Sequence, residues 1–126
     1  MIELTDKPIR QEKVHERLTS KESGSVVVHY AVVKNVADGK RTAGIRFAPD
    51  GDLEGELREL EKKVRGKWKI EDMVLIRRVG ELRTGDIIMA AAVSAEGRDE
   101  AFGACRDVVD GCKKLKCIKK TELYEE

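Results

Sequence analysis

Five lysines lie within eight residues near the end of this chain, namely Lys113, Lys114, Lys116, Lys119 and Lys120. The whole sequence of 126 residues carries a formal net charge of only +1, so positive charge is concentrated here. Such a cluster can hold an anionic small molecule or a nucleic-acid backbone, or it can be an ordinary solvated surface. A lysine beside other cations can also act as a nucleophile or a general base, which a solvated lysine does not do.

Other cations can join these lysines if the fold gathers them, chiefly Lys34, Arg41, Arg77, Arg78 and Arg98. Together they would form a pocket for a small phosphorylated ligand. Nucleic-acid binding is less favoured, because Tyr124 is the only aromatic residue in the tail and bases are held by stacking. The sequence has no Walker loop and no GxGxxG, GxSxG or HExxH motif, so it indicates none of those common sites.

The three cysteines, Cys105, Cys112 and Cys117, are an odd number without a CxxC pair, which argues against a secreted disulfide framework and predicts no metal site. Cys105 and Cys112 lie on one helical face, which favours buried thiols. Cys112 and Cys117 could still form a bridge or, less favoured, bind a metal ion. The two histidines, His15 and His29, are distant in sequence, and His29 interrupts an apolar strand, where a structural role is favoured.

The composition is that of one globular domain spanning residues 1–126, with a core of Val, Ile, Leu and Ala because aromatic residues make up only 4%. Charged residues make up 39%, and there is one glutamine and one asparagine, which is typical of thermophiles. No apolar run approaches membrane-spanning length and the N-terminus lacks a signal-peptide pattern. We therefore expect a soluble, cytoplasmic protein.

Apolar residues at helical spacing predict three helices, over residues 8–18, 53–68 and 99–112. Either Asp50 or Asp52 is positioned to cap the second helix, and Gly66 to end it. Lys113 and Lys114 follow the third helix, where they would also complement the helix dipole.

Runs of apolar and β-branched residues predict strands over residues 1–4, 25–33, 41–47, 73–77, 87–93 and 118–123. The strand over 25–33 is apolar on both faces, which favours a central position in a sheet. Asp38 and Gly39 predict a hairpin turn between that strand and the next. Strands and helices mix without a βαβ rhythm, so the predicted class is α+β.

The order of segments in the second half of the chain is distinctive: Val74–Leu82, Thr84–Asp86, a strand ending at Ser94-Ala95, Arg98–Phe102, and a helix into Lys113. A basic pair before Gly-Glu-Leu, a Gly-Asp turn, a strand closing on Ser-Ala and an Ala-Phe helix that runs into a lysine resemble the large catalytic subunit of molybdopterin synthase. Upstream, Gly24–Asn35 resembles that family's Gly-Ala…Val-Arg-Asn stretch. The resemblance extends from about Gly24 to Glu122.

This resemblance implies a hammerhead-like α+β fold with a mostly antiparallel sheet and packed helices. It also implies a homodimer within a heterotetramer, completed by a small ubiquitin-like subunit that ends in Gly-Gly. The implied reaction moves sulfur from the thiocarboxylated C-terminus of that subunit to cyclic pyranopterin monophosphate (precursor Z), forming molybdopterin. The implied enzyme is a sulfurtransferase of molybdenum cofactor biosynthesis, without a metal or a cofactor.

Matched position by position, the family's two motif lysines fall on Lys113 and Lys120, which the resemblance implies are catalytic. The implied substrate-binding residues are Val32, Val33, Lys34, Gly97, Arg98, Lys113, Lys120, Thr121 and Glu122. Lys34 and Arg98 would hold the phosphate, and the two catalytic lysines would bind the pterin. One of these two would transfer a proton or form a transient adduct.

The sequence departs from the family pattern at two places near the implied site. The family's Ser-Ala-His-Arg is here Ser94-Ala-Glu-Gly-Arg98, with Gly97 in the place of the histidine. The family's Pro-Phe-Trp before the second lysine is here Cys117–Lys119. These departures leave an alternative, a non-catalytic relative that binds a ubiquitin-like partner or an anionic ligand. A basic-surface protein that binds RNA is a third reading.

Overall fold

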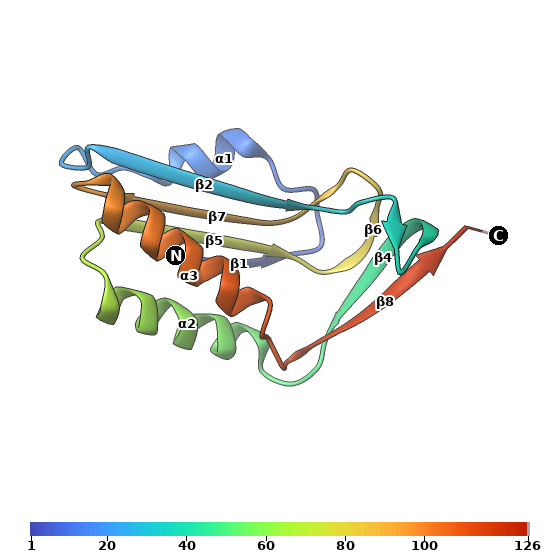
Figure 1. The fold of residues 1–126 in the computed structure, drawn as a ribbon. Coiled ribbons are helices and arrows are strands. Elements are labelled where there is room, and N and C mark those ends of the chain that lie inside the picture. Colours follow the sequence, from blue (N-terminus) through green and yellow to red (C-terminus); the bar gives the residue numbers. More distant parts are fainter. Residues whose placement is uncertain (126) are drawn as a thin grey trace.

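The structure is a computed structural model that describes residues 1–125. The strands are β1 (Ile2–Thr5), β2 (Ser25–Val32), β3 (Val36–Ala37), β4 (Lys40–Pro49), β5 (Asp72–Arg78), β6 (Gly80–Arg83), β7 (Ile87–Ala95) and β8 (Ile118–Tyr124). The helices are α1 (Gln11–Glu16), α2 (Leu53–Lys67) and α3 (Arg98–Cys112). The strands form two sheets, and the smaller, ribbon-like one extends from one end of the larger (Figure 1).

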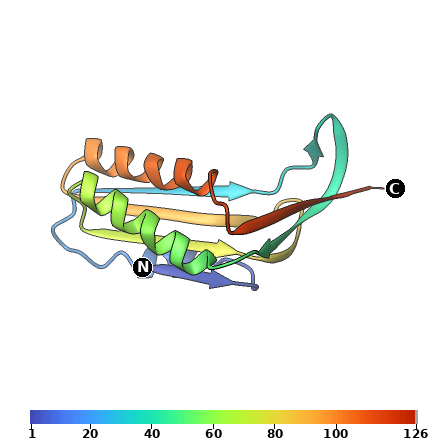
Figure 2. The ribbon, with the colours of Figure 1, turned by 90° about the horizontal axis from the view of Figure 1, so that it is seen from below.

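The larger sheet has the strand order β1-β5-β7-β2, with β1 parallel to β5 and the other neighbours antiparallel. Helices α2 and α3 lie side by side on one face of this sheet, as Figure 2 shows from below. Helix α1 covers the other face, where Val14 packs against Val74 and Ile76 of β5. Because side chains alternate along a strand, β5 supplies both faces with apolar residues.

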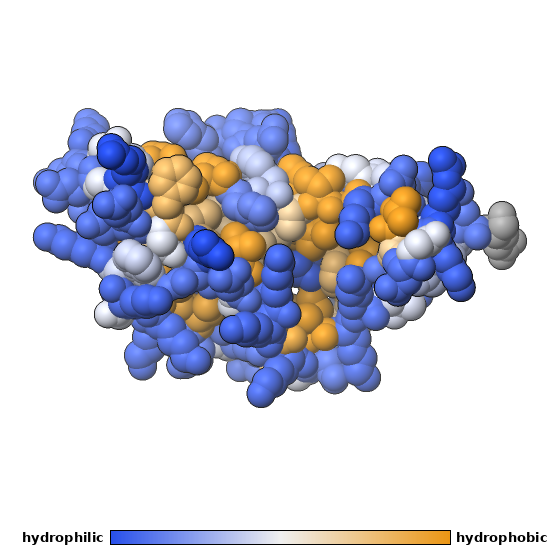
Figure 3. Space-filling view, viewed as in Figure 1, coloured by the Kyte–Doolittle hydropathy of each residue, from blue (hydrophilic) through white to orange (hydrophobic). Residues whose placement is uncertain are grey.

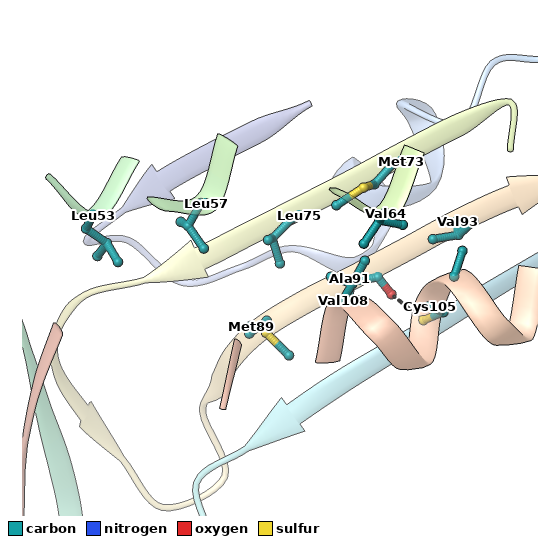
Figure 4. Close-up of a cluster of buried hydrophobic side chains, with 11 residues drawn as sticks. Leu53, Leu57, Val64, Met73, Leu75, Met89, Ala91, Val93, Cys105 and Val108 are labelled. Carbon is teal, nitrogen blue, oxygen red and sulfur yellow. Dashed lines mark hydrogen bonds between the residues drawn. The ribbon is translucent and has the colours of Figure 1, made fainter. Parts of the chain in front are cut away.

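The main core lies between the larger sheet and the helix pair (Figure 4). Leu53, Leu57 and Val64 of α2 meet Met73 and Leu75 of β5 in this layer. Strand β7 and helix α3 add the residues Met89, Ala91, Val93, Cys105 and Val108. Arg77 continues the same side of β5 at the end of the core, so a charged residue takes a position that the strand pattern gives to apolar ones.

The two helices approach closely because α3 carries glycines where α2 presents large side chains. A Cβ atom on Gly103 would collide with the Trp68 ring, and one on Gly111 would collide with Leu60. The Trp68 indole also donates a hydrogen bond of 2.8 Å to the Asp107 carboxylate. This packing fixes the position of α3 against α2, and therefore where Lys113, the residue after α3, lies.

The smaller sheet is built around β4, which pairs with β3, β6 and β8. Asp38 and Gly39 have positive φ values of 52° and 75° and make the tight turn between β3 and β4. Strand β8 runs antiparallel to β4 over nearly its whole length, from Pro49↔Ile118 to Thr42↔Tyr124. Strand β8 begins close to the end of α3 and leads away from it along this ribbon, so the lysine-rich tail lies where the two elements meet (Figure 1).

The predicted α+β class with a mostly antiparallel sheet is confirmed. The helices at 53–68 and 99–112 and the last strand lie where the sequence places them, and Asp52 caps α2 by accepting a hydrogen bond of 2.9 Å from the Gly55 backbone. The single-domain organisation over residues 1–126 stays a prediction. Within residues 1–125, no helix has the length and apolar character needed to cross a membrane.

Three expectations are wrong in detail. Strand β2 lies at the edge of its sheet, not at the centre, and leaves Val26, Val28 and Val32 exposed. Gly66 does not end α2, which continues to Lys67, because its backbone stays helical and nothing crowds it. The Asp38–Gly39 turn joins β4 to the short strand β3 instead of to the long strand.

Candidate functional site

A cleft lies where the ends of β2 and β7, the C-terminal end of α3 and the β4–β8 ribbon meet. It consists of two adjoining cavities of about 430 and 460 Å³. Both cavities are lined by His29, Ala31, Ile45, Ile88, Lys113 and Lys120. Figure 3 shows hydrophobic side chains between α3 and the ribbon, with hydrophilic ones around them.

The two halves of the cleft differ in the residues that each adds to this shared set. The Arg77 half adds Phe47, Arg77, Met89, Val109, Cys112, Leu115 and Ile118. The Lys34 half adds Tyr30, Val32, Val33, Lys34, Val36, Ala37 and Glu122. The two lysines predicted to be catalytic therefore stand where the halves join.

Lys113 is placed by the end of α3. It is the C-cap residue, and its backbone N–H is 3.3 Å from the Val109 carbonyl and 3.2 Å from that of Asp110. The last turn of the helix thus fixes its backbone while the side chain stays exposed at the cleft. No carboxylate lies within 4.0 Å of its ammonium among residues 1–125, so its charge is available to a ligand.

Lys120 is placed by the register of β8. Side chains alternate along a strand, so Lys120 and Glu122 share the face that lines the cleft, and Thr121 points the other way. The Lys120 ammonium lies 3.3 Å from a Glu122 carboxylate oxygen. Lys119 instead makes an exposed ion pair of 3.7 Å with Asp50, outside the cleft.

Lys34 follows β2 at a point where the backbone is held on both sides. The Val33 N–H donates to the Asp86 carbonyl at 3.0 Å, and the Val33 carbonyl accepts from the Gly85 N–H at 2.8 Å. A break in register between Ala31 and Val32 turns the chain at the same place. Val32, Val33 and Lys34 all line the Lys34 half.

Gly97 and Arg98 are not brought to this cleft within one chain. They begin α3, and Lys113 follows its last residue. At 1.5 Å per residue, this helix separates the backbones of Arg98 and Lys113 by about 22 Å. The structure therefore gathers six of the nine predicted substrate-binding residues, leaving out Gly97, Arg98 and Thr121.

The loop between α3 and β8 is anchored to α2 by Glu56. Its carboxylate accepts hydrogen bonds from the backbone N–H groups of Lys116 (2.9 Å) and Cys117 (2.9 Å). Partial burial acts to raise the pKa of Glu56, but these hydrogen bonds outweigh it and the pKa is lowered. The anion is therefore the form that holds the loop.

His29 and Arg77 also line the cleft, although the family resemblance implied neither as a site residue. Arg77 was one of the cations expected to form a pocket if the fold gathered them. His29 is exposed there, so the structural role favoured from the sequence is wrong: β2 is an edge strand. Arg77 is only 7% exposed, and burial lowers its pKa. Burial likewise raises the pKa of the neighbouring Cys112 thiol to about 11. The three cysteines are free thiols.

The cleft presents Lys34, Lys113 and Lys120, an arrangement that suits an anionic ligand and acid–base chemistry. The comparison with known families makes this specific. The chain belongs to the family described as MoaE protein, whose model matches residues 4–115.

Individual relatives support the same family assignment. The molybdopterin synthase catalytic subunit of a Nostoc species is 29% identical over 127 residues, covering 98% of this chain and 76% of the relative. The crystal structure of molybdopterin synthase from Staphylococcus aureus matches with a TM-score of 0.90 at 26% identity, covering 98% of this chain and 91% of that one. A complex of subunits 1 and 2 of molybdopterin-converting factor from Helicobacter pylori shares the fold, with a TM-score of 0.76 at 13% identity, over 99% and 90% of the two chains.

Proposed function

We propose that this protein is the catalytic subunit of molybdopterin synthase, a sulfurtransferase of molybdenum cofactor biosynthesis. It would transfer sulfur from the thiocarboxylated C-terminus of a small ubiquitin-like subunit to cyclic pyranopterin monophosphate. The observation that carries the proposal is the convergence of Lys113 and Lys120 from α3 and β8 on one cleft. The family and its catalytic-subunit relatives support the same reaction.

In this mechanism, the ammonium groups of Lys34, Lys113 and Lys120 attract the anionic substrate into the cleft. Lys113 and Lys120 contact both halves, so they stand between the substrate and the incoming sulfur. One of them donates the proton taken up by the leaving substrate oxygen as a carbon–sulfur bond replaces a carbon–oxygen bond. Water then cleaves the bond between that sulfur and the carrier's carbonyl carbon, leaving a carboxylate on the carrier. Glu122 orients Lys120 through their ion pair.

A small subunit is part of the proposal, since the sulfur must arrive on a carrier. The Helicobacter pylori neighbour is described as a complex of two subunits, although at 13% identity that likeness carries the fold alone. We also propose a homodimer within a heterotetramer, acting in the cytoplasm and without a cofactor. In such a dimer Arg98 can serve a cleft only if it reaches the cleft of the other copy.

A second candidate is a non-catalytic relative that binds a ubiquitin-like partner or an anion. The observation that favours it is Gly97, which stands where the family's histidine is expected and offers no side chain for proton transfer. The cleft lysines would then serve binding only.

The test is conversion of cyclic pyranopterin monophosphate to molybdopterin by the purified protein with a verified, thiocarboxylated small subunit. Product formed at a rate that depends on both components supports the synthase. Partner binding that survives the double change Lys113→Ala and Lys120→Ala, without any product from the unmodified protein, would support the binding relative instead. A salt-sensitive affinity for RNA would favour a third class of function.

A further inference from the structure

Arg77 is the most deeply buried cation of the cleft. Its side chain points from β5 into the Arg77 half with only 7% of its surface exposed. Its Nε atom is buried without a hydrogen-bond partner, and among residues 1–125 no carboxylate makes an ion pair with its guanidinium. The adjacent Arg78, in contrast, pairs with Asp86 at 3.3 Å.

A buried charge without a counter-ion is costly, and proteins rarely retain one without a use. The Phe47 ring lies 4.2 Å from the guanidinium carbon and stabilises the cation on one face. Because the ring covers that face, an anion would approach the guanidinium along an edge, where its N–H groups lie. The geometry therefore suits a planar anion that binds edge-on with two parallel hydrogen bonds.

We propose that Arg77 binds the terminal carboxylate, or thiocarboxylate, of the sulfur-donating small subunit. This inference rests on the proposed function and adds a residue to its site. The guanidinium would hold the end of the tail beside Lys113 and Lys120, which line the same cavity. After sulfur transfer and hydrolysis by water, the same contact would retain the carboxylate product until the tail leaves.

The alternative anion is the phosphate of the pterin substrate, and the lining residues argue against it. Apart from Arg77 and Cys112, the residues that only the Arg77 half contributes are apolar. A pterin has hydrogen-bonding atoms on most of its edges and would leave many of them unpaired there. The Lys34 half instead offers Tyr30, Lys34 and Glu122. The narrow tail therefore fits the Arg77 half and the phosphorylated pterin fits the Lys34 half.

The test compares two forms of the small subunit, one ending in a Gly-Gly carboxylate and one in a Gly-Gly amide. Dissociation constants are measured by calorimetry with the unmodified protein and with Arg77→Met, which keeps bulk but removes the charge. We expect the unmodified protein to prefer the carboxylate by about 10- to 100-fold, as charge-assisted hydrogen bonds allow. Arg77→Met should lose most of this preference, with the affinity for the amide unchanged, and any remaining preference would come from Lys113 and Lys120.

Two controls make the result specific. Arg41→Met removes an exposed arginine of β4 outside the cleft and should keep the preference. Arg77→Lys keeps the positive charge but loses the paired N–H donors of the guanidinium, so it should retain only part of the preference for the carboxylate. This variant also tests the inference if Arg77→Met fails to fold. Affinity for cyclic pyranopterin monophosphate should change less than about twofold in Arg77→Met. The substitution alters the Arg77 half and leaves the contacts of the Lys34 half in place.

The inference is overturned if Arg77→Met keeps the full preference for the carboxylate, or if it loses affinity for the pterin substrate instead. Both results can occur in a protein that turns over normally, so they leave the proposed function standing. If the unmodified protein binds neither form of the small subunit, the proposed function fails together with this inference.

Discussion

Lys120 lies directly opposite Phe47 in the antiparallel ladder between β8 and β4. The register of this ladder decides which of two adjacent lysines faces the cleft, because a slip by one residue would exchange Lys120 for Lys119. The hydroxyl of the buried Thr42 lies within hydrogen-bonding distance of the Leu123 carbonyl (2.9 Å) and of the Gly44 backbone, where the register shifts. The ladder thus turns Lys120 toward the cleft and Lys119 toward Asp50 and solvent.

Lys120→Ala should lower the rate of molybdopterin formation by at least about 100-fold, the scale of one general acid or base. Lys119→Ala should change it less than about twofold, because Lys119 pairs with Asp50 outside the cleft. Both rates are measured with saturating thiocarboxylated small subunit, and circular dichroism checks the fold. Equal losses of rate in the two variants would contradict the prediction that Lys120, and not Lys119, takes part in the reaction.

Arg98 gives a test of the proposed dimer. Arg98→Ala and Lys113→Ala should each be inactive, but a mixture that has exchanged subunits should recover about a quarter of the unmodified activity, because half of the dimers then contain one intact site of two. As the control, each variant alone is taken through the same exchange procedure and should stay inactive. If the mixture stays inactive while light scattering shows mixed dimers, Arg98 does not serve the cleft of the other copy.

Glu56→Gln should destabilise the protein by about 1 kcal/mol at neutral pH, because two backbone N–H groups lose a charged acceptor. The pKa of Glu56 is lowered in the folded state, so its contribution is present above the ordinary value of 4.5 and is lost as the pH falls through the folded value. The difference from the unmodified protein should therefore shrink in acid. Urea unfolding from pH 3 to 7 measures it.

The matched control for that change is Glu59→Gln, an exposed position on the same helix. It should alter stability by less than about 0.5 kcal/mol at any of these pH values, as surface changes usually do. A difference between Glu56→Gln and the unmodified protein that grows below pH 4 would contradict the lowered pKa.

Cys105 and Cys112 should be alkylated slowly, because burial raises both pKa values to about 11. At pH 8 only about one thiol in a thousand is then ionised, and the rate should rise nearly tenfold per pH unit up to pH 10. Mass spectrometry of iodoacetamide-treated protein follows each cysteine separately. The urea-unfolded chain is the control, and a plateau near pH 9 in the folded protein would refute the prediction.

Two glycines should respond oppositely to alanine. Gly66→Ala should stabilise the protein by about 1 kcal/mol, because Gly66 lies inside α2 and a Cβ there meets nothing within 4 Å. Gly103→Ala should destabilise it by about 1–3 kcal/mol, because the Trp68 ring would have to move. Thermal unfolding compares the two. Similar effects in both variants would show that the two helices do not depend on this close approach.

The helices that carry the site could be predicted because their apolar residues recur at helical spacing over four turns. Leu53, Leu57 and Val64 are all buried as that spacing requires. The edge position of β2 could not be predicted, because exposed valines such as Val26 and Val28 resemble those of a buried strand. Strand β6 was also missed, because four residues flanked by turns carry too little periodicity.

Within the site, the two lysines could be matched to lysines of the family's motifs. The sequence could not show which of Arg77 and Arg78 points into the cleft. Which member of that basic pair points inward depends on the alternation of β5 and on the cover that Phe47 provides from β4. Arg98 shows the converse: its match to a motif says nothing of its distance from Lys113, which the length of α3 sets.

The pairing of β4 with β8 has a consequence for how the protein folds. It joins Thr42 to Tyr124 across most of the chain, so it cannot form until the final strand has been synthesised. Contacts between residues so distant in sequence close slowly, because a long loop must lose its conformational freedom first. The larger sheet and its helices are complete by Cys112, so they can assemble before this pairing forms. The newly made protein would thus acquire its ligand-binding competence in the last step of folding.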